Sequence, residues 1–254
     1  MSTSNIPEEE SLEEQIGIIE TTPNEAADPP DVVEAKIPAY IRAKYELLSY
    51  RNAAVILAET RSAEVAELWG ALRSFSVTKE MIRKAGGNES EMPKLFTASL
   101  RPKGWHETVI SADLLIRLTW REQVGVFTHG KRKGKPRFVK KELATRRDRY
   151  LDGHKIDYVK NRVAFDLEWN SKDQTFDRDL YAFNAFFLSG AIDVGVLVTR
   201  GQSLQKALGR MGLKKYGAST TWWGKLVYRL NAGRNGGCPV LAVGITPACI
   251  SDWS

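Results

Sequence analysis

Three carboxylates lie in and beside a short strand-forming segment in the second half of the chain. Residues 157–168 read DYVKNRVAFDLE, and from Val163 onward apolar residues alternate with the others. A period of two is typical of a β-strand, so we expect Asp166 and Glu168 to project from one face while the other face packs. Carboxylates that share a face repel one another unless a positive charge lies among them. The segment therefore predicts a site that binds a cation.

A hairpin is expected to bring the third carboxylate to the same face. The preceding KIDYV also has the composition of a strand, and Lys160–Asn161 would form a two-residue turn. In that register Asp157 is opposite Ala164, and it lies diagonal to Asp166 at roughly 7–8 Å. Asp157 then shares its face with Asp166 and Glu168.

Paired carboxylates in a basic chain suit phosphodiester hydrolysis. Mg²⁺ takes oxygen ligands and keeps several waters, so Asp157 and Asp166 together with a substrate phosphate would suffice to bind it. A metal held in this way can polarise the phosphoryl group and lower the pKa of an attacking water. The alternative is that the aspartates are solvent-facing strand residues paired with Lys155, Lys160 or Arg162. The spacing alone leaves both interpretations open.

Charge is distributed unevenly along the chain. Residues 1–35 contain ten Asp or Glu and no Lys or Arg, whereas the remainder holds 37 basic and 21 acidic residues. Such a basic body is expected to attract polyanions, with nucleic acid as the first candidate, although a merely basic surface is the alternative. The run from Lys131 to Arg149 has ten basic residues against two acidic ones. We expect this run to contact phosphate, through Arg146 and Arg147 among others, and its second half, VKKELATRRDRYL, to be a helix.

Three regions are predicted along the chain. Residues 1–36 form an acidic tail, low in aromatic residues and expected to be disordered. Residues 37–94 form a helical region with two amphipathic helices between Ile41 and Ser74, whose Leu47 and Leu48 are expected on an apolar helix face, and a third helix that ends at Gly86–Gly87. Residues 95–254 form the core, which begins with loop and a short strand. From residue 155 to 246 strands alternate with helices, which predicts an α/β fold with a mixed sheet.

Several classes of protein are disfavoured by composition. Cys238 and Cys249 lie eleven residues apart without a CxxC pattern, so a disulfide framework or a zinc site is not expected. The longest apolar stretch, residues 182–198, is interrupted by polar residues and glycine, so no membrane span is predicted. The first residues are acidic rather than basic and apolar, which indicates a cytoplasmic protein rather than a secreted one.

The sequence also resembles a known family. The strings GHKIDYVKNRVAFDLEWNSKDQTFDRDL, KYGASTTWWGKL and GRNGGCPVLAVGIT are similar to BglII-type restriction endonucleases, relatives of BamHI in the PD-(D/E)xK nuclease superfamily. The similarity spans about residues 95 to 246. It implies a restriction-endonuclease-like α/β/α core with a mixed sheet. It also implies a Mg²⁺-dependent enzyme that cuts double-stranded DNA as a homodimer at a short palindrome.

The resemblance assigns roles to the three carboxylates. Asp157 corresponds to the metal-binding aspartate of the family, and Asp166 falls at its second acidic position. Glu168 stands where most of the superfamily has lysine, so it would orient the attacking water or act as its general base. Asp166 is one methylene shorter than the glutamate more usual there. A further carboxylate, often on a preceding helix in such enzymes, would be Glu142.

Polar residues after the second predicted strand are candidates for reading DNA bases, because side chains that hydrogen-bond in the major groove distinguish base pairs. One set directly follows the strand, and the other precedes a predicted helix, where it could instead form an N-cap. Trp222 and Trp223 are expected in the core or at a dimer contact. The two candidate sets are Asn170, Ser171 and Lys172, and Ser219 and Thr220.

Together these observations predict a type II restriction endonuclease, with a DNA methyltransferase that protects the same sites as its genetic partner. One alternative is a nuclease of the same fold that serves repair or phage defence. Another is a DNA-binding protein that has lost cleavage. The helices between Ile41 and Ser74 are expected to contribute to a homodimer interface. The acidic tail would either compete with DNA for the basic surface or have no function.

Overall fold

The structure is a computed structural model that describes residues 23, 25–84 and 91–253. These residues form two compact units. The first contains the chain up to Thr108 and from Lys155 onward, and the second contains Val109–His154. The predicted boundary between residues 94 and 95 falls inside the first unit.

A mixed sheet of six strands forms the centre of the first unit, in the order β1-β6-β5-β4-β3-β2. The strands β4, β5 and β6 are parallel to one another, whereas β1 runs antiparallel to β6 and β3 runs antiparallel to β4. The strand bounds are β1 (Tyr45–Tyr50), β2 (His106–Val126), β3 (Pro136–Lys160), β4 (Val163–Glu168), β5 (Val194–Arg200) and β6 (Val240–Ile245). The predicted mixed sheet is confirmed.

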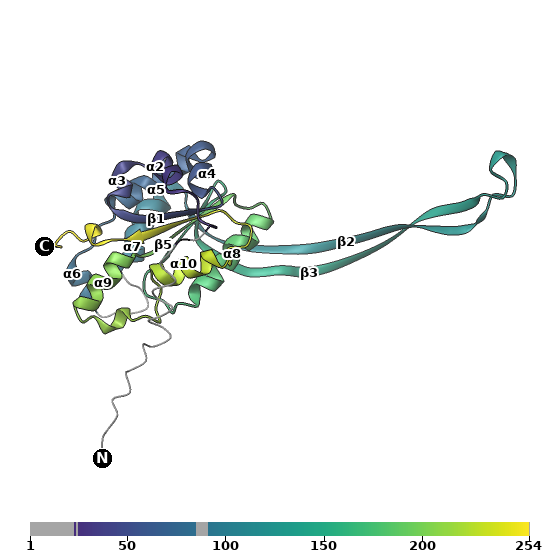
Figure 1. The fold of residues 1–254 in the computed structure, drawn as a ribbon. Coiled ribbons are helices and arrows are strands. Elements are labelled where there is room, and N and C mark those ends of the chain that lie inside the picture. The colour runs from purple at the N-terminus through teal and green to yellow at the C-terminus, as the bar shows by residue number, and fades with distance from the viewer. Residues whose placement is uncertain (1–22, 24, 85–90, 254) are drawn as a thin grey trace, which may run out of the picture. The chain divides into compact units, whose positions relative to one another are not determined.

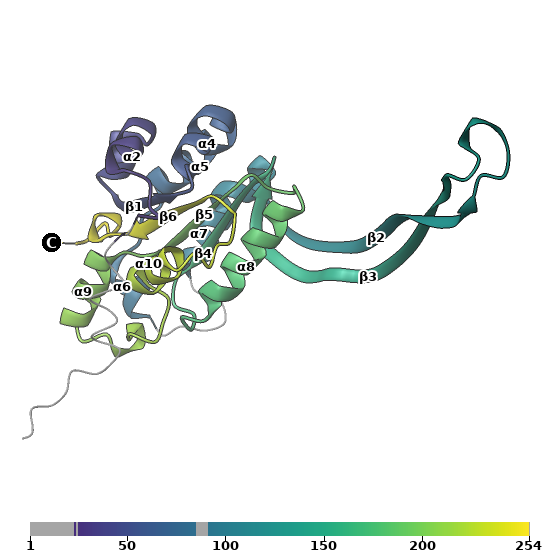
Figure 2. The ribbon, with the colours of Figure 1, turned by 45° about the vertical axis from the view of Figure 1, so that its right-hand side comes forward.

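Helices cover both faces of this sheet, with α2, α4 and α5 on one side and α8, α9 and α10 on the other (Figures 1 and 2). This arrangement confirms the predicted α/β/α class. On the first side Phe96 packs against Phe165 of β4, with ring centroids 5.0 Å apart. The helix bounds are α2 (Pro30–Lys36), α3 (Ala39–Arg42), α4 (Ala53–Thr60), α5 (Ser62–Ser74), α6 (Lys79–Arg83), α7 (Glu91–Leu100), α8 (Thr175–Leu188), α9 (Gln202–Arg210) and α10 (Trp223–Asn231).

Glycines on the sheet allow α8 and α10 to pack closely. A Cβ at Gly195 of β5 would lie 2.4 Å from the ring of Phe183 on α8, and one at Gly244 of β6 would lie 2.8 Å from the indole of Trp223 on α10. Any larger residue at these positions would push the helices outward. The close approach of α8 seals the face of β4 that carries Asp166 and Glu168.

Some predicted elements differ in the structure. Leu47 and Leu48 lie in β1 rather than on a helix, because Tyr45–Tyr50 pairs along its whole length with β6. The segment expected to be loop and short strand is α7 followed by the long strand β2, and the predicted helix VKKELATRRDRYL is part of β3. Long-range pairing overrides local propensity in these strands. The helix α2 lies within the predicted disordered tail, while residues 1–22 and Gly86–Gly87 lie outside the described residues.

The hairpin turn is shifted by one residue from its predicted position. Asn161 and Arg162 form it with φ angles of 42° and 71°, the positive values that a type I′ hairpin turn requires. The strands pair as Tyr158 with Phe165 and Val159 with Ala164, and continuing this register puts Asp157 opposite Asp166. The predicted register differed by two positions along β4. A register shift of an even number of residues leaves each side chain on the same face of the sheet. The prediction that the three carboxylates share one face is therefore unaffected.

Candidate active site

The carboxylates of β4 are buried. Asp166 is 4% exposed and Glu168 is 6% exposed, and every residue of β4 is buried. The expectation of one packed and one open face was therefore wrong, because α8 covers the face that bears the acidic residues. Asp157 on β3 is partly exposed and provides the edge of the cluster that solvent reaches.

Helix α8 adds a fourth carboxylate that sequence reasoning missed. Asp179 is 2% exposed, and its charge raises the pKa of both Asp166 and Glu168. The signal in the sequence was its position on an otherwise apolar helix face, between Phe176 and Phe183 at helical spacing. The structure thus brings together Asp157, Asp166, Glu168 and Asp179, which we call the acidic cluster.

Burial raises the pKa of each carboxyl in the interior of this cluster. For Glu168 burial is the largest cause and Asp179 the next, and together they raise the pKa to about 8. The pKa of Asp166 is also raised, first by burial and then by Asp179, Asp157 and Glu168. Burial raises the pKa of Asp179 against the opposing effect of Arg178. Without a further cation, the pKa of about 8 favours the protonated form of Glu168 at neutral pH.

Few protein cations neutralise the cluster. The guanidinium of Arg178 lies 3.0 Å from Asp179 and 3.5 Å from Glu168, but its side chain is 71% exposed. The three basic residues proposed as partners of the aspartates bind elsewhere: Lys155 pairs with Glu107, Lys160 with Glu67, and Arg162 with Asp193. The interpretation of Asp157 and Asp166 as solvent-facing residues with those partners is therefore not supported.

The oxygen atoms of the cluster fit a hard divalent cation. Within the described residues, Glu168 Oε2 and Asp179 Oδ2 are buried and have no hydrogen-bond partner. Buried carboxylate oxygens without donors are costly unless a cation satisfies them. The part of the chain that the structure describes contains no group of three or more His, Cys, Asp or Glu side chains arranged to hold one ion. An ion that takes only one or two carboxylates and completes its shell with water and phosphate, as Mg²⁺ does, would be compatible with this arrangement.

The two predicted base-reading segments lie side by side. Lys172 and Thr220 form an antiparallel bridge, and the backbone N–H of Thr221 donates to the carbonyl of Ser171 at 2.8 Å. The hydroxyl of Thr220 donates to Gly217 at 2.7 Å and also accepts from Arg200, so it is used within the loop. The side chains of Asn170, Lys172 and Ser219 are exposed and bind no other described residue. The N-cap of α10 is Trp222, without a side-chain cap, so the capping alternative is not realised.

A buried arginine holds the segment at Thr220 and Thr221 in place. Arg200 at the end of β5 donates to the Thr221 carbonyl at 2.7 and 3.1 Å and to Gln205 at 2.8 Å. Its guanidinium also lies over the ring of Tyr216, 4.8 Å from the centroid. Burial lowers the pKa of Arg200 to about 9. A cation buried this deeply rigidifies the edge of the sheet beside the acidic cluster.

The remaining predicted residues lie in the second unit. Arg146 and Arg147 are exposed on β3, and Arg146 pairs with Asp113 and Asp148 at 2.5 Å each. Glu142 is also exposed on β3, so the expectation that it lies on a helix preceding the site was wrong. The long strand pairing of β2 with β3 replaces that helix. Arg146, Arg147 and Glu142 belong to the second unit, whereas the acidic cluster belongs to the first.

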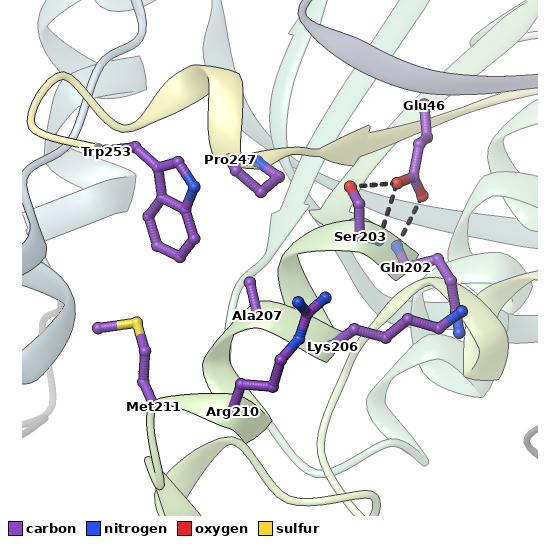
Figure 3. Close-up of a pocket in the computed structure, with 9 residues that line it drawn as sticks. All are labelled: Glu46, Gln202, Ser203, Lys206, Ala207, Arg210, Met211, Pro247 and Trp253. Atoms are coloured by element: carbon purple, nitrogen blue, oxygen red, sulfur yellow. Dashed lines mark hydrogen bonds between the residues drawn. The ribbon is translucent and has the colours of Figure 1, made fainter.

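A pocket elsewhere in the first unit holds a satisfied carboxylate. Glu46 of β1 accepts hydrogen bonds from the backbone N–H groups of Gln202 and Ser203, at 2.6 and 2.9 Å, beside Lys206 and Arg210 (Figure 3). This contact stabilises the first turn of α9 through its unpaired N–H groups. Since every feature of Glu46 is explained by that role, the pocket is not assigned to the active site.

The described residues thus combine an α/β/α fold with buried carboxylates at the end of a central strand, in a basic protein. The family model for restriction endonuclease BglII/BglIII matches residues 45–245, from the first residue of β1 to the last of β6. The chain belongs to this family and is therefore a site-specific deoxyribonuclease that acts on double-stranded DNA. A comparison with curated proteins finds no match. No helix of the described residues is long and apolar enough to cross a membrane.

Proposed function

We propose that the protein is a Mg²⁺-dependent type II restriction endonuclease whose chemistry takes place at the acidic cluster. The observation that supports this most strongly is the set of buried carboxylates with unsatisfied oxygens at the C-terminal end of β4. Protein folding alone does not favour such an arrangement, because the buried groups repel one another. A binding site for a divalent cation and a phosphate explains its presence.

Each carboxylate is given a role by its exposure and charge. Asp157, at the open edge, and Asp166, opposite it, would hold the ion. When bound, Mg²⁺ supplies charge that polarises the scissile phosphate and lowers the pKa of a water. Glu168 would accept a proton from the attacking water once the charge of a bound cation lowers its raised pKa of about 8. Asp179 and Arg178 set the charge around Glu168 and so act as positioning residues.

Sequence recognition is assigned to the paired segments that follow β4 and precede α10. Asn170, Lys172 and Ser219 have exposed side chains at one edge, and each can reach a hydrogen-bonding group of a base or a phosphate. Their backbones are tied together through the bridge between Lys172 and Thr220. Rigid support of this kind lowers the entropic cost of binding DNA.

A homodimer and a protecting methyltransferase complete the proposal. A palindrome presents the same half-site twice. Two identical chains that each read one half-site are related by a two-fold axis, which an isologous interface provides. The apolar residues between Ile41 and Ser74 that suggested an interface are largely buried within the chain, with Leu57, Leu68 and Leu72 all at 0% exposure. The dimer therefore rests on the symmetry argument. Light scattering that finds only a monomer during double-strand cleavage would contradict it.

Plasmid digestion with Mg²⁺ is the direct test. Discrete fragments support a type II restriction endonuclease. A nicked circle or a smear supports a nuclease of the same fold with a different task, such as repair or phage defence. No change of the plasmid, with binding retained, supports a DNA-binding protein that has lost cleavage. A plasmid from a host that expresses a methyltransferase specific for the same sites should resist cutting.

A further inference from the structure

The second unit is a two-stranded ribbon, which we call the arm (Val109–His154). It consists of the distal parts of β2 and β3, which run side by side in both views, and a tip that contains the 3₁₀ turn Gly130–Arg132 (Figures 1 and 2). From Arg117 to Tyr150 all side chains are exposed except those of Phe127 and Val139, which are partly buried. A two-stranded ribbon without a packed layer is marginally stable in water. The arm therefore has the character of a binding element.

The arm carries the excess positive charge of the protein. It contains twelve Lys or Arg and five Asp or Glu, while the remaining residues of the chain hold 25 basic and 26 acidic ones. Ion pairs within the arm engage Lys141, Arg146 and Arg149. The other nine basic side chains are exposed and form no ion pair with any described residue. These are Arg117, Arg121, Lys131, Arg132, Lys133, Lys135, Arg137, Lys140 and Arg147.

The two faces of β2 differ in chemistry. Even-numbered positions carry an apolar row that includes Leu118 and Trp120, which are 55% and 46% exposed. Odd-numbered positions carry Arg117, Thr119, Arg121 and Gln123. An apolar row alone would also suit a second copy of the chain. Two copies of an arm with a net charge of +7 repel each other, whereas a polyanion is attracted, so charge complementarity favours DNA.

We propose that the arm binds the phosphate backbone of duplex DNA outside the recognised sequence. β3 connects the arm to the site directly, since Asp157 lies three residues beyond His154 on the same strand. At about 3.3 Å per residue the β2 part of the arm is about 60 Å long, which corresponds to about 17 base pairs of duplex. The inference rests on the double-stranded DNA substrate and not on the roles proposed for the acidic cluster.

A pair of matched variants tests the arm without requiring cleavage. The arm variant is Arg121→Ala, Arg132→Ala, Arg137→Ala, and the control is Arg42→Ala, Arg73→Ala, Arg83→Ala, which removes the same charge from exposed helix residues of the first unit. Binding to a duplex of about 40 base pairs is measured in EDTA over a range of salt. The slope of log affinity against log salt should fall by about 2 to 3 for the arm variant, at about 0.9 per lost phosphate contact, and be unchanged for the control.

A tethered probe locates the arm on DNA. Cys238 and Cys249 are buried, so Lys133→Cys places one accessible thiol at the tip for iron-EDTA attachment. Strand scission should fall outside the recognised sequence, within about 17 base pairs of the cut site.

Three outcomes would overturn the proposal: an unchanged slope for the arm variant, equal losses for both variants, or scission confined to the recognised sequence. A fall in solution mass for Leu118→Ser, Trp120→Ser, with unchanged DNA binding, would identify a second copy as the partner instead. If the arm variant binds DNA more weakly but still cleaves plasmid, the proposed function is not contradicted. Normal arm binding without any cleavage contradicts the proposed function alone.

Discussion

The acidic cluster and the arm are opposite in charge, in exposure and in the way they hold that charge. Asp166, Glu168 and Asp179 are at most 6% exposed and lie under α8, whereas nine basic side chains of the arm are exposed to solvent. Burial changes the acid–base behaviour of the carboxyls, as the raised pKa of Glu168 shows. The basic side chains of the arm are instead exposed, so they can contact phosphates directly. We propose that the enzyme thus separates the charges that perform chemistry from those that supply affinity.

The largest expected effect is on cleavage at the acidic cluster. Asp157→Ala, Asp166→Ala and Glu168→Ala should each reduce cleavage by about a thousandfold or more, because each removes an ion ligand or the group that manages the attacking water. Binding in metal-free buffer should persist for all three, and it should tighten slightly for Asp157→Ala, since that carboxylate lies at the open edge of the cluster. Plasmid cleavage and filter binding measure the two effects. The control is Asp177→Asn on α8, whose carboxylate pairs with Arg229 and Arg234.

Glu168→Lys tests whether cleavage requires a carboxyl group at position 168. The variant introduces the residue that the resemblance implies is commoner at this position, but it places a cation beside Arg178 and removes the proposed proton acceptor. We expect it to be inactive in the plasmid assay while its DNA binding is retained. Cleavage at a rate near that of the unmodified protein would show that Glu168 is not a base.

Asp179→Asn should have a smaller effect, of about 10- to 100-fold on cleavage, because Asp179 acts through Glu168. The distinguishing readout is the pH profile. With the negative charge gone, the raised pKa of Glu168 should fall, and the acidic limb of the profile should move to lower pH. A uniform loss of activity without a shift of that limb would reduce Asp179 to a structural role.

Stability should depend on pH through the same cluster. The folded-state pKa of Glu168, about 8, lies above its ordinary value of 4.5, so the folded protein binds more protons than the unfolded chain between these values. Metal-free protein should therefore lose stability as pH rises from about 4.5 to about 8. Thermal unfolding of Glu168→Gln should show a shallower decline. Equal slopes for both proteins would contradict the raised pKa.

The smallest expected effect concerns the acidic tail. Asp28 accepts hydrogen bonds from Ser49 and from the backbone of Asn52, and Val33 of α2 is buried, so a deletion should stop at residue 22. Residues 1–22 carry six acidic side chains and no basic ones. If they compete with DNA for the basic surface, their removal should tighten non-specific binding a few-fold at low salt. That gain should shrink as salt increases. Unchanged affinity at low salt would indicate a tail without this function.

Local patterns in the sequence were sufficient for the class of fold and for three of the four acidic residues. Alternation from Val163 to Glu168 predicted β4, and the succession of strands and helices read from residue 155 to 246 predicted the strands that follow it, because these patterns depend only on neighbouring residues. The shared face of Asp157, Asp166 and Glu168 was also predictable, since an error of two positions in register leaves the face unchanged. The resemblance, carried by unusual strings from residue 153 to 246, indicated the family.

Contacts between distant parts of the chain decided the rest. Only packing shows that α8 buries Asp166 and Glu168 and adds Asp179. Packing likewise shows that the backbone of Ser171 donates to the Thr221 hydroxyl, while Arg200 binds the Thr221 carbonyl. Two strands were not predicted from the sequence for the same reason. Tyr45–Tyr50 pairs with a strand almost two hundred residues away, and β3 pairs as a long strand in the arm where local propensity predicted a helix. Burial and register are properties of the whole fold, because the partners that create them are remote in sequence.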